Sequence, residues 1–133
     1  MYDVFISYSS KDKTYADAIV HTLEENGLKC WIAYRDAVPG ISYSESIVSA
    51  IRDAKVFLLI FSENSKASVH VKNEINYATK VGALIIPFRV EDVKPDDSLE
   101  YYLGATHWLE ALTKPLQNHI LRLKDTIKGA LIH

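Results

Sequence analysis

Short apolar runs alternate along the chain with longer segments in which apolar residues recur every three or four positions. The first pattern is typical of β-strands, and the second of helices with one buried face. The predicted strands span residues 2–8, 28–32, 55–61, 83–88 and 106–109. The predicted helices span residues 12–26, a segment around 47–51, a segment from 71 to about 82, and residues 116–131. Because strands and helices alternate, right-handed crossovers favour a flavodoxin-like, doubly wound five-stranded parallel sheet with helices on both faces.

The segments between these elements are polar or contain Gly and Pro, and we expect them to be loops. Residues 33–40 end in Pro39-Gly40, a turn signal. Residues 62–67 are polar, and residues 91–98 are acidic and contain Pro. In doubly wound sheets the ligand crevice lies at the carboxyl ends of the strands, where the strand order reverses between strands one and three. We therefore expect residues 9–13 and 62–67, with the start of the helix that follows, at the crevice.

Length and charge limit the classes of function. The 133 residues suit one domain spanning 1–133, which can equally be one piece of a longer chain. Fifteen Lys and Arg against 17 Asp and Glu give a net charge of −2, which argues against nucleic acid and anionic membranes as partners. No apolar run approaches the roughly 20 residues that span a bilayer. Met1 leads directly into a predicted strand without a signal-peptide pattern, so a cytoplasmic location is expected.

The residues that commonly bind metal are sparse. Cys30 is the single cysteine, which excludes an internal disulfide and a zinc site with several Cys ligands. The five His residues show no metal-ligand spacing, so no metal is expected. Cys30 is predicted to pack as a small hydrophobic residue, and Trp31, Phe57 and Trp108 are predicted to belong to the core.

Two common functions of the flavodoxin-like fold match this sequence poorly. A response-regulator receiver needs an acidic pair after strand one, an Asp after strand three and a Lys after strand five. The chain has Tyr8-Ser9-Ser10, Ser62-Glu63 and His107-Trp108 at those places.

A flavodoxin would bind the FMN phosphate in its first loop, and residues 7–14 are rich in Ser and Thr. They contain no Gly that would let backbone N–H groups close on a phosphate, which argues against FMN.

A series of motifs resembles the Toll/interleukin-1 receptor (TIR) domain family. Residues 2–12, YDVFISYSSKD, resemble its first signature box, and residues 35–40, RDAVPG, resemble the second box in what the family calls the BB loop. Residues 61–78, which include FSENS and NEI, are similar to the third element. Residues 85–88 and 107–109 match the last two strands of the family. The resemblance runs through the whole chain in the right order, and its style is closer to bacterial members than to animal or plant members.

Enzymatic TIR domains cleave the bond between nicotinamide and ribose in NAD+, and the resemblance implies Glu74 as the catalytic residue. Nicotinamide leaves as a neutral pyridine from a cationic ring, so the general acid that glycosidases use is unnecessary. One carboxylate can then stabilise the positive charge that develops on the ribose, with NAD+ as substrate and no cofactor. We expect Glu74 and His70, four residues apart, on a flank of the buried stripe of Val71 and Ile75. The alternative is that Glu74 is a solvated surface carboxylate.

The resemblance also implies a set of substrate-binding candidates. Ser9 and Ser10 lie where some family enzymes carry basic residues, so they would bind the pyrophosphate or ribose through hydroxyl and N–H groups. Tyr34 and Arg35 begin the BB loop and could stack on a base or pair with phosphate, or could simply pack at a hinge. His70 replaces the Trp of many enzymatic members, so its smaller ring would give less contact with the substrate; capping of the helix start is the alternative.

The loop tip at Ala37, Val38, Pro39 and Gly40 places apolar and turn residues where solvent is expected, which suggests a partner surface. In TIR domains generally this loop docks on a neighbouring TIR domain. Head-to-tail docking is heterologous and can extend into filaments. The resemblance therefore implies self-association, with the neighbour's loop completing the NAD+ site.

Two classes of function remain open from the sequence. The first is an NAD+ nucleosidase or cyclase in signalling or antiviral defence, which would release nicotinamide with ADP-ribose or a cyclic ADP-ribose isomer. The second is a noncatalytic TIR adaptor that signals by assembly with other TIR domains. Glu74 favours the enzyme, and nothing in the sequence decides between hydrolysis and cyclisation.

Overall fold

The computed structural model describes residues 1–40, 42–104 and 106–132 and contains a five-stranded, all-parallel sheet. The strands are β1 (Tyr2–Ser7), β2 (Cys30–Trp31), β3 (Ala54–Phe61), β4 (Leu84–Arg89) and β5 (Leu109–Glu110). Their order across the sheet is β2-β1-β3-β4-β5, so the direction of winding reverses between β1 and β3. This order confirms the predicted flavodoxin-like fold.

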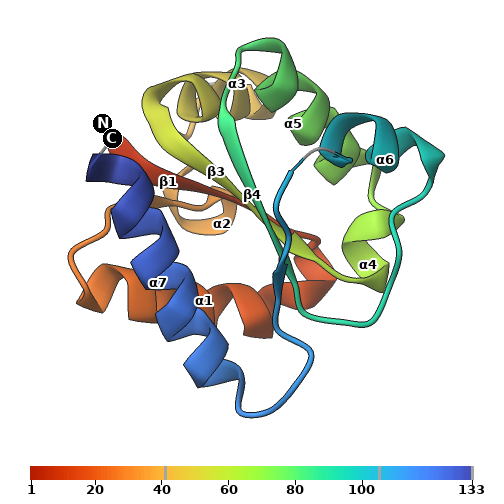
Figure 1. The fold of residues 1–133 in the computed structure, drawn as a ribbon. Coiled ribbons are helices and arrows are strands. Elements are labelled where there is room, and N and C mark those ends of the chain that lie inside the picture. Colours follow the sequence, from red (N-terminus) through yellow and green to blue (C-terminus); the bar gives the residue numbers. More distant parts are fainter. Residues whose placement is uncertain (41, 105, 133) are drawn as a thin grey trace.

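Helices cover both faces of the sheet, as the alternating pattern predicts. They are η1 (Ser10–Asp12), α1 (Lys13–Glu25), α2 (Ala33–Asp36), α3 (Tyr43–Asp53), α4 (Glu63–Lys66), α5 (Val69–Lys80), α6 (Asp97–Leu103) and α7 (Leu116–Ile132). Figure 1 shows α1 and α7 together on one side of the sheet and α3 and α5 on the other. The site described below lies on the α3 and α5 side.

Alternation along the central strands builds two cores, one on each face of the sheet. In β1, Val4 and Ile6 pack toward α1 and α7, whereas Phe5 packs toward α3 and α5. Residues 56–61 of β3 are all buried, because helices cover this strand on both sides. Cys30, Trp31 and Phe57 are buried and Trp108 packs against the second core, as predicted.

Three predicted loops contain short helices. One turn of helix, α2, forms within residues 33–40, and another, α4, forms within residues 62–67. The third, α6, begins inside the predicted loop 91–98. Side-chain caps explain two of them, since Ser62 Oγ accepts from the Ser65 N–H at 3.1 Å and Asp96 Oδ1 accepts from the Leu99 N–H at 3.0 Å. These helices are too short to give a periodic apolar pattern, so the sequence did not reveal them.

The last strand starts later than predicted. It was expected from Thr106, but β5 begins at Leu109 and pairs with only two residues of β4, Phe88 and Arg89. The Thr106 N–H instead donates to the Leu103 carbonyl at 3.0 Å, which continues the end of α6. The edge of β4 before Phe88 is therefore not paired with β5.

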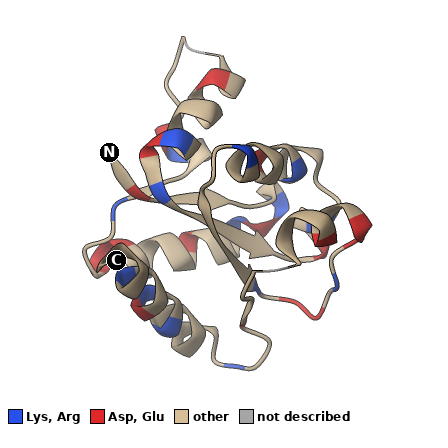
Figure 2. Ribbon diagram, turned by 45° about the horizontal axis from the view of Figure 1, so that its top comes forward, with Lys and Arg blue, Asp and Glu red and all other residues tan. Residues whose placement is uncertain are grey.

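Charge is dispersed over the surface. Figure 2 shows acidic and basic residues interspersed over the helices and loops. None of the helices in the described part of the chain has the length and apolar character needed to cross a bilayer. Among the described residues, His, Cys, Asp and Glu side chains form no group of three or more that could hold a metal ion.

Candidate active site

A small cavity opens at the carboxyl end of β1, beside the start of α5. Its volume is about 120 Å³. It is lined by Phe5, Ile6, Tyr8, Ser9, Ser10, Ala33, Tyr43, Ile47, Ser68, His70 and Glu74. The switch point of the sheet thus brings together Ser9, Ser10, His70 and Glu74, four of the six residues proposed from the sequence for substrate binding and catalysis.

Among the described residues that line this cavity, Glu74 is the only carboxylate, and it is nearly buried, with 9% of its surface exposed. Its Oε1 accepts a hydrogen bond of 2.7 Å from the hydroxyl of Ser7, the last residue of β1. The expected position on a flank of the stripe is therefore wrong, and the alternative of a solvated surface carboxylate is also contradicted. Val71, Glu74, Ile75 and Ala78 are all buried, and their spacing of three, four and seven residues places Glu74 within the apolar stripe of α5.

Burial changes the acidity of this carboxyl group. Removal from water disfavours the charged form and raises the pKa of Glu74 from 4.5 to about 7, although the Ser7 hydrogen bond acts in the opposite direction. Near neutral pH the group is then present in both protonation states. An ionised carboxylate in this setting acts strongly on a nearby positive charge, because little water screens it.

A second hollow lies on the other side of Glu74, between α3 and α5. Its volume is about 230 Å³, and it shares Tyr43, Ile47, His70 and Glu74 with the first cavity. The rings of Tyr43 and His70 meet edge to face, with centroids 6.0 Å apart at an angle of 76°. Glu74 and this aromatic pair therefore border both hollows.

Sequence reasoning missed two residues of this site. Ser7 was placed in the first predicted strand and in the Ser-rich segment 7–14 without a role at the site, yet a polar residue at the end of a strand that is buried on both faces signals a buried partner. Tyr43 is half exposed and follows the BB loop, and no pattern in the sequence distinguishes it from an ordinary surface tyrosine.

The first loop is held in place by a buried carboxylate. Ser9 is buried, and its Oγ accepts from the Lys11 N–H at 3.3 Å, whereas Ser10 is exposed at the rim. Asp12 is 5% exposed and accepts hydrogen bonds from the hydroxyl of Ser62 and, at 3.0 Å, from Asn64 Nδ2. Segment 62–67 was expected at the crevice. It does not line the cavity but anchors the loop that does.

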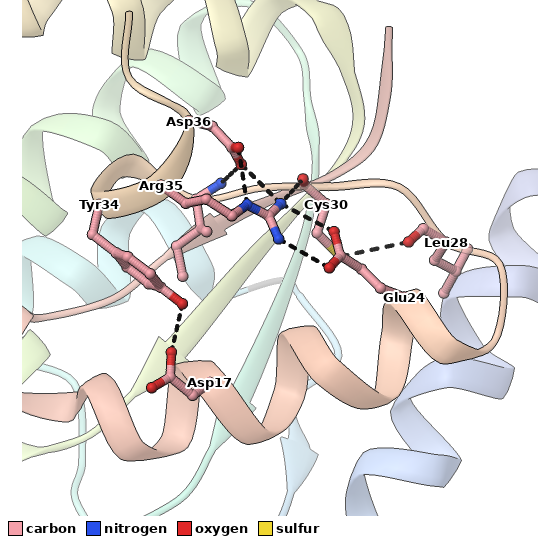
Figure 3. Close-up of polar contacts among 8 residues, drawn as sticks. Asp17, Glu24, Leu28, Cys30, Tyr34, Arg35 and Asp36 are labelled. Carbon is pink, nitrogen blue, oxygen red and sulfur yellow. Dashed lines mark hydrogen bonds and ion pairs between the residues drawn. The ribbon is translucent and has the colours of Figure 1, made fainter.

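The structure does not bring Tyr34 and Arg35 into the cavity. Figure 3 shows both side chains directed toward α1. Tyr34 Oη donates to Asp17 at 2.5 Å, and the Arg35 guanidinium makes two parallel bonds of 2.9 and 3.0 Å to Glu24. Arg35 Nε also pairs with Asp36 at 2.9 Å. These contacts attach α2 to α1, in agreement with the packing role that was the alternative to substrate binding.

The loop after α2 presents an apolar tip. Val38 is 51% exposed, and Pro39 and Gly40 are exposed beside it, whereas Ala37 packs against the core. Gly40 has φ of +84°, a conformation that residues with a side chain rarely adopt. Glycine at this position is therefore required by the backbone, as the turn signal suggested.

A larger cavity lies elsewhere and lacks comparable chemistry. It measures about 560 Å³, borders the unpaired edge of β4 and contains mostly apolar and Thr side chains, with His107 and Tyr102 as its titratable groups. None of the described residues that line it is a carboxylate or a thiol. The smaller cavity at Glu74 is therefore the better candidate for catalysis.

Comparisons with known proteins agree with this fold. The chain is 32% identical over 103 residues to "Stimulator of interferon genes protein" of Magallana gigas, which covers 73% of this chain and 25% of that protein. It is 32% identical over 100 residues to "Probable 2' cyclic ADP-D-ribose synthase BdTIR" of Brachypodium distachyon, which covers 74% of this chain and 44% of that protein. The chain thus spans less than half the length of either relative.

Among solved structures, the TIR domain of the Toll-related receptor TRR-2 from Hydra magnipapillata has the same fold. It superposes with a TM-score of 0.82 at 23% identity, covering 96% of this chain and 99% of that chain. A family model described as "TIR domain" matches residues 4–121, which is most of the chain. The protein therefore belongs to the TIR domain family.

Proposed function

We propose that this domain cleaves the bond between nicotinamide and ribose in NAD+, with Glu74 as the catalytic carboxylate. The observation that carries the proposal is a nearly buried carboxylate, hydrogen-bonded by Ser7, that borders both hollows at the switch point of the sheet. The Brachypodium relative, a probable 2' cyclic ADP-D-ribose synthase, is consistent with this activity.

The chemistry needs little more than this carboxylate. As the glycosidic bond breaks, positive charge develops on the ribose and nicotinamide leaves as a neutral ring. Ionised Glu74 in a desolvated site stabilises that charge more in the transition state than in the ground state, which is the condition for faster cleavage. In this proposal Ser9 and Ser10, which line the cavity, bind ribose or diphosphate oxygens, and the exposed His70 ring contacts the base.

The size of the site supports dependence on assembly. A volume of 120 Å³ has room for about four water molecules. Sites for ligands of drug size usually measure about 300–1,000 Å³. The adjoining hollow measures about 230 Å³, so neither hollow by itself is large enough to enclose a dinucleotide. We propose that the exposed tip at Val38, Pro39 and Gly40 docks on a second copy of the domain, and that the neighbour's loop completes the site.

Two reaction outcomes follow from one cleavage step. Capture of the ribosyl cation by water yields ADP-ribose, and capture by the adenine ring yields a cyclic ADP-ribose isomer. Either product would suit a signalling enzyme, and antiviral defence in a bacterium is the role that the sequence resemblance suggests. The chromatographic separation of the products from one reaction distinguishes the two outcomes.

The proposal is tested by nicotinamide release. Concentrated or artificially clustered wild-type protein is incubated with NAD+ at pH 8, beside Glu74→Gln and the control Ser46→Ala, which alters a buried hydroxyl outside both hollows. We expect Glu74→Gln to lower the rate by a factor of about 10²–10³, as loss of one such electrostatic group typically does. Absence of nicotinamide from all three proteins, with TIR assembly intact, would support the noncatalytic adaptor instead.

A further inference from the structure

Ser7 occupies a position where an apolar residue would be expected. It is the last residue of β1, pairs with Leu59 of β3 and has no exposed surface. Alternation along β1 places Ser7 on the same face as Phe5, toward the core that α3 and α5 cover. A hydroxyl in such a place needs a partner, and its partner is Glu74 Oε1, 67 residues away in the sequence.

The contact uses one of the two carboxylate oxygens of Glu74. Oε1 accepts from the Ser7 hydroxyl, and Oε2 has no hydrogen bond from any described residue. A carboxylate held at one oxygen cannot rotate freely about its last bond. Ser7 therefore fixes the plane of the carboxylate and leaves the second oxygen available to a ligand in the hollows.

Few other groups compensate the charge of Glu74. The other titratable side chains that line the two hollows are Tyr8, directly after β1, Tyr43 from α3, and His70 and Tyr77 from α5. Among the described residues that line the two hollows there is no Lys or Arg. Strand β1 and helix α3, which pack against Glu74, contribute apolar side chains such as Phe5 and Ile47. The Ser7 hydroxyl is thus the one side-chain donor that the described residues provide to this carboxylate.

We propose that Ser7 is a positioning residue for Glu74, which orients the carboxylate toward the hollows and stabilises its ionised form. The effect of Ser7 on the orientation and titration of the Glu74 carboxylate is argued from the geometry alone, whereas its effect on turnover rests on the proposed function. The two parts are therefore measured separately.

The first measurement is a titration that requires no activity. The side-chain carboxyl carbon of Glu74 is followed by ¹³C NMR from pH 4 to 9 in wild-type protein, with Glu74→Gln used to assign the signal. In Ser7→Ala the midpoint should rise by about one pH unit, because a hydrogen bond to the charged form is lost. Ser7→Thr keeps the hydroxyl and should restore the wild-type midpoint. Ser46→Ala removes a buried hydroxyl that has no partner among the described residues and should leave the midpoint unchanged.

The second measurement is the pH profile of nicotinamide release. If Glu74 acts as an anion, the acid limb in Ser7→Ala should move upward by the same amount as the NMR midpoint. At pH values below the midpoint, a midpoint that is higher by one unit lowers the ionised fraction of Glu74 about tenfold. In Ser7→Ala, kcat should therefore fall about tenfold at these pH values with little change in KM, and the loss should shrink at pH 9.

The outcomes separate the two proposals. An unchanged or lowered midpoint in Ser7→Ala, or an equal rise in Ser46→Ala, would overturn the positioning role even if the protein cleaves NAD+. A raised midpoint in a protein without NADase activity would support the positioning role and count against the proposed function. A raised midpoint with a parallel shift of the pH profile would support both.

Discussion

Replacement of Glu74 by Gln should make the protein more stable at alkaline pH, although Glu74 is the residue proposed for catalysis. Gln has nearly the same shape, can still accept the Ser7 hydrogen bond and carries no charge. Glu74 in the folded protein has a pKa of about 7, above the 4.5 of a carboxyl group in water. Above pH 7 folding therefore keeps an ionised carboxylate in a site where it is poorly solvated, and unfolding returns it to water.

The sign and size follow from these two pKa values. Below pH 4.5 Glu74 is protonated in both the folded and the unfolded chain, so folding carries no cost of ionisation. As the pH rises from 4.5 to 7, the unfolded chain ionises before the folded one, so the wild type loses up to about 3 kcal/mol of unfolding free energy, and this loss levels off above pH 7. Gln has no such loss. At pH 8 this difference corresponds to a Tm higher by about 10 °C in Glu74→Gln for a domain of this size.

Urea denaturation followed by circular dichroism at pH 4.5, 6 and 8 measures the difference directly, with the slope m compared to confirm that the unfolded states are alike. Glu45→Gln, at an exposed carboxylate on α3, is the control for loss of one negative charge. The stability advantage of Glu74→Gln should grow with pH, and that of Glu45→Gln should not. An advantage that is independent of pH, or a less stable Glu74→Gln protein at pH 8, would show that the carboxylate is not buried as described.

Three further substitutions test other parts of the structure. Gly40→Arg should weaken self-association, because the left-handed backbone at Gly40 disfavours a side chain and because a charge would enter the docking surface. Specific activity measured against protein concentration should then rise only at higher concentrations than in the wild type. Tethering two subunits should restore the activity. Ile75→Asp, at a position with no exposed surface, should prevent folding by burying an unpaired charge, and a cooperative urea transition in this protein would contradict the helix orientation. Glu24→Gln should cost only about 0.5–1 kcal/mol in urea denaturation because its ion pair with Arg35 is partly exposed, and a loss several times larger would mean that this pair determines the position of α2.

The position of Gly40 and the identity of Glu74 could be read from the sequence because each depends on a local signal. The Pro39-Gly40 pair indicates a turn wherever it occurs, and φ of +84° at Gly40 agrees with that indication. Glu74 was selected by its motif, which requires no knowledge of its surroundings. Its place in the buried stripe was also visible from its spacing to Val71, Ile75 and Ala78, but a carboxylate there is so uncommon that the flank was the natural expectation.

The side chain of Arg35 illustrates what a local signal cannot decide. Its motif placed it beside the crevice, and the chain does bring α2 near that end of the sheet. Glu24 and Asp36 nevertheless hold the guanidinium toward α1. Glu24 lies 11 residues earlier on a different helix, and nothing in the spacing of the sequence indicates that the two groups meet.

The sequence by itself determined the five strands and the helices on both faces, because the period of the apolar residues reflects the local geometry of each element. The resemblance of its motifs indicated the family. Only the tertiary structure decided what surrounds Glu74. The Ser7 hydroxyl, the Tyr43 ring and the two hollows come from β1, α3 and α5, which are distant in the chain and meet only when the sheet forms. Hydrogen bonding and desolvation depend on that meeting, and they in turn set the ionisation of the carboxylate on which the proposed chemistry depends.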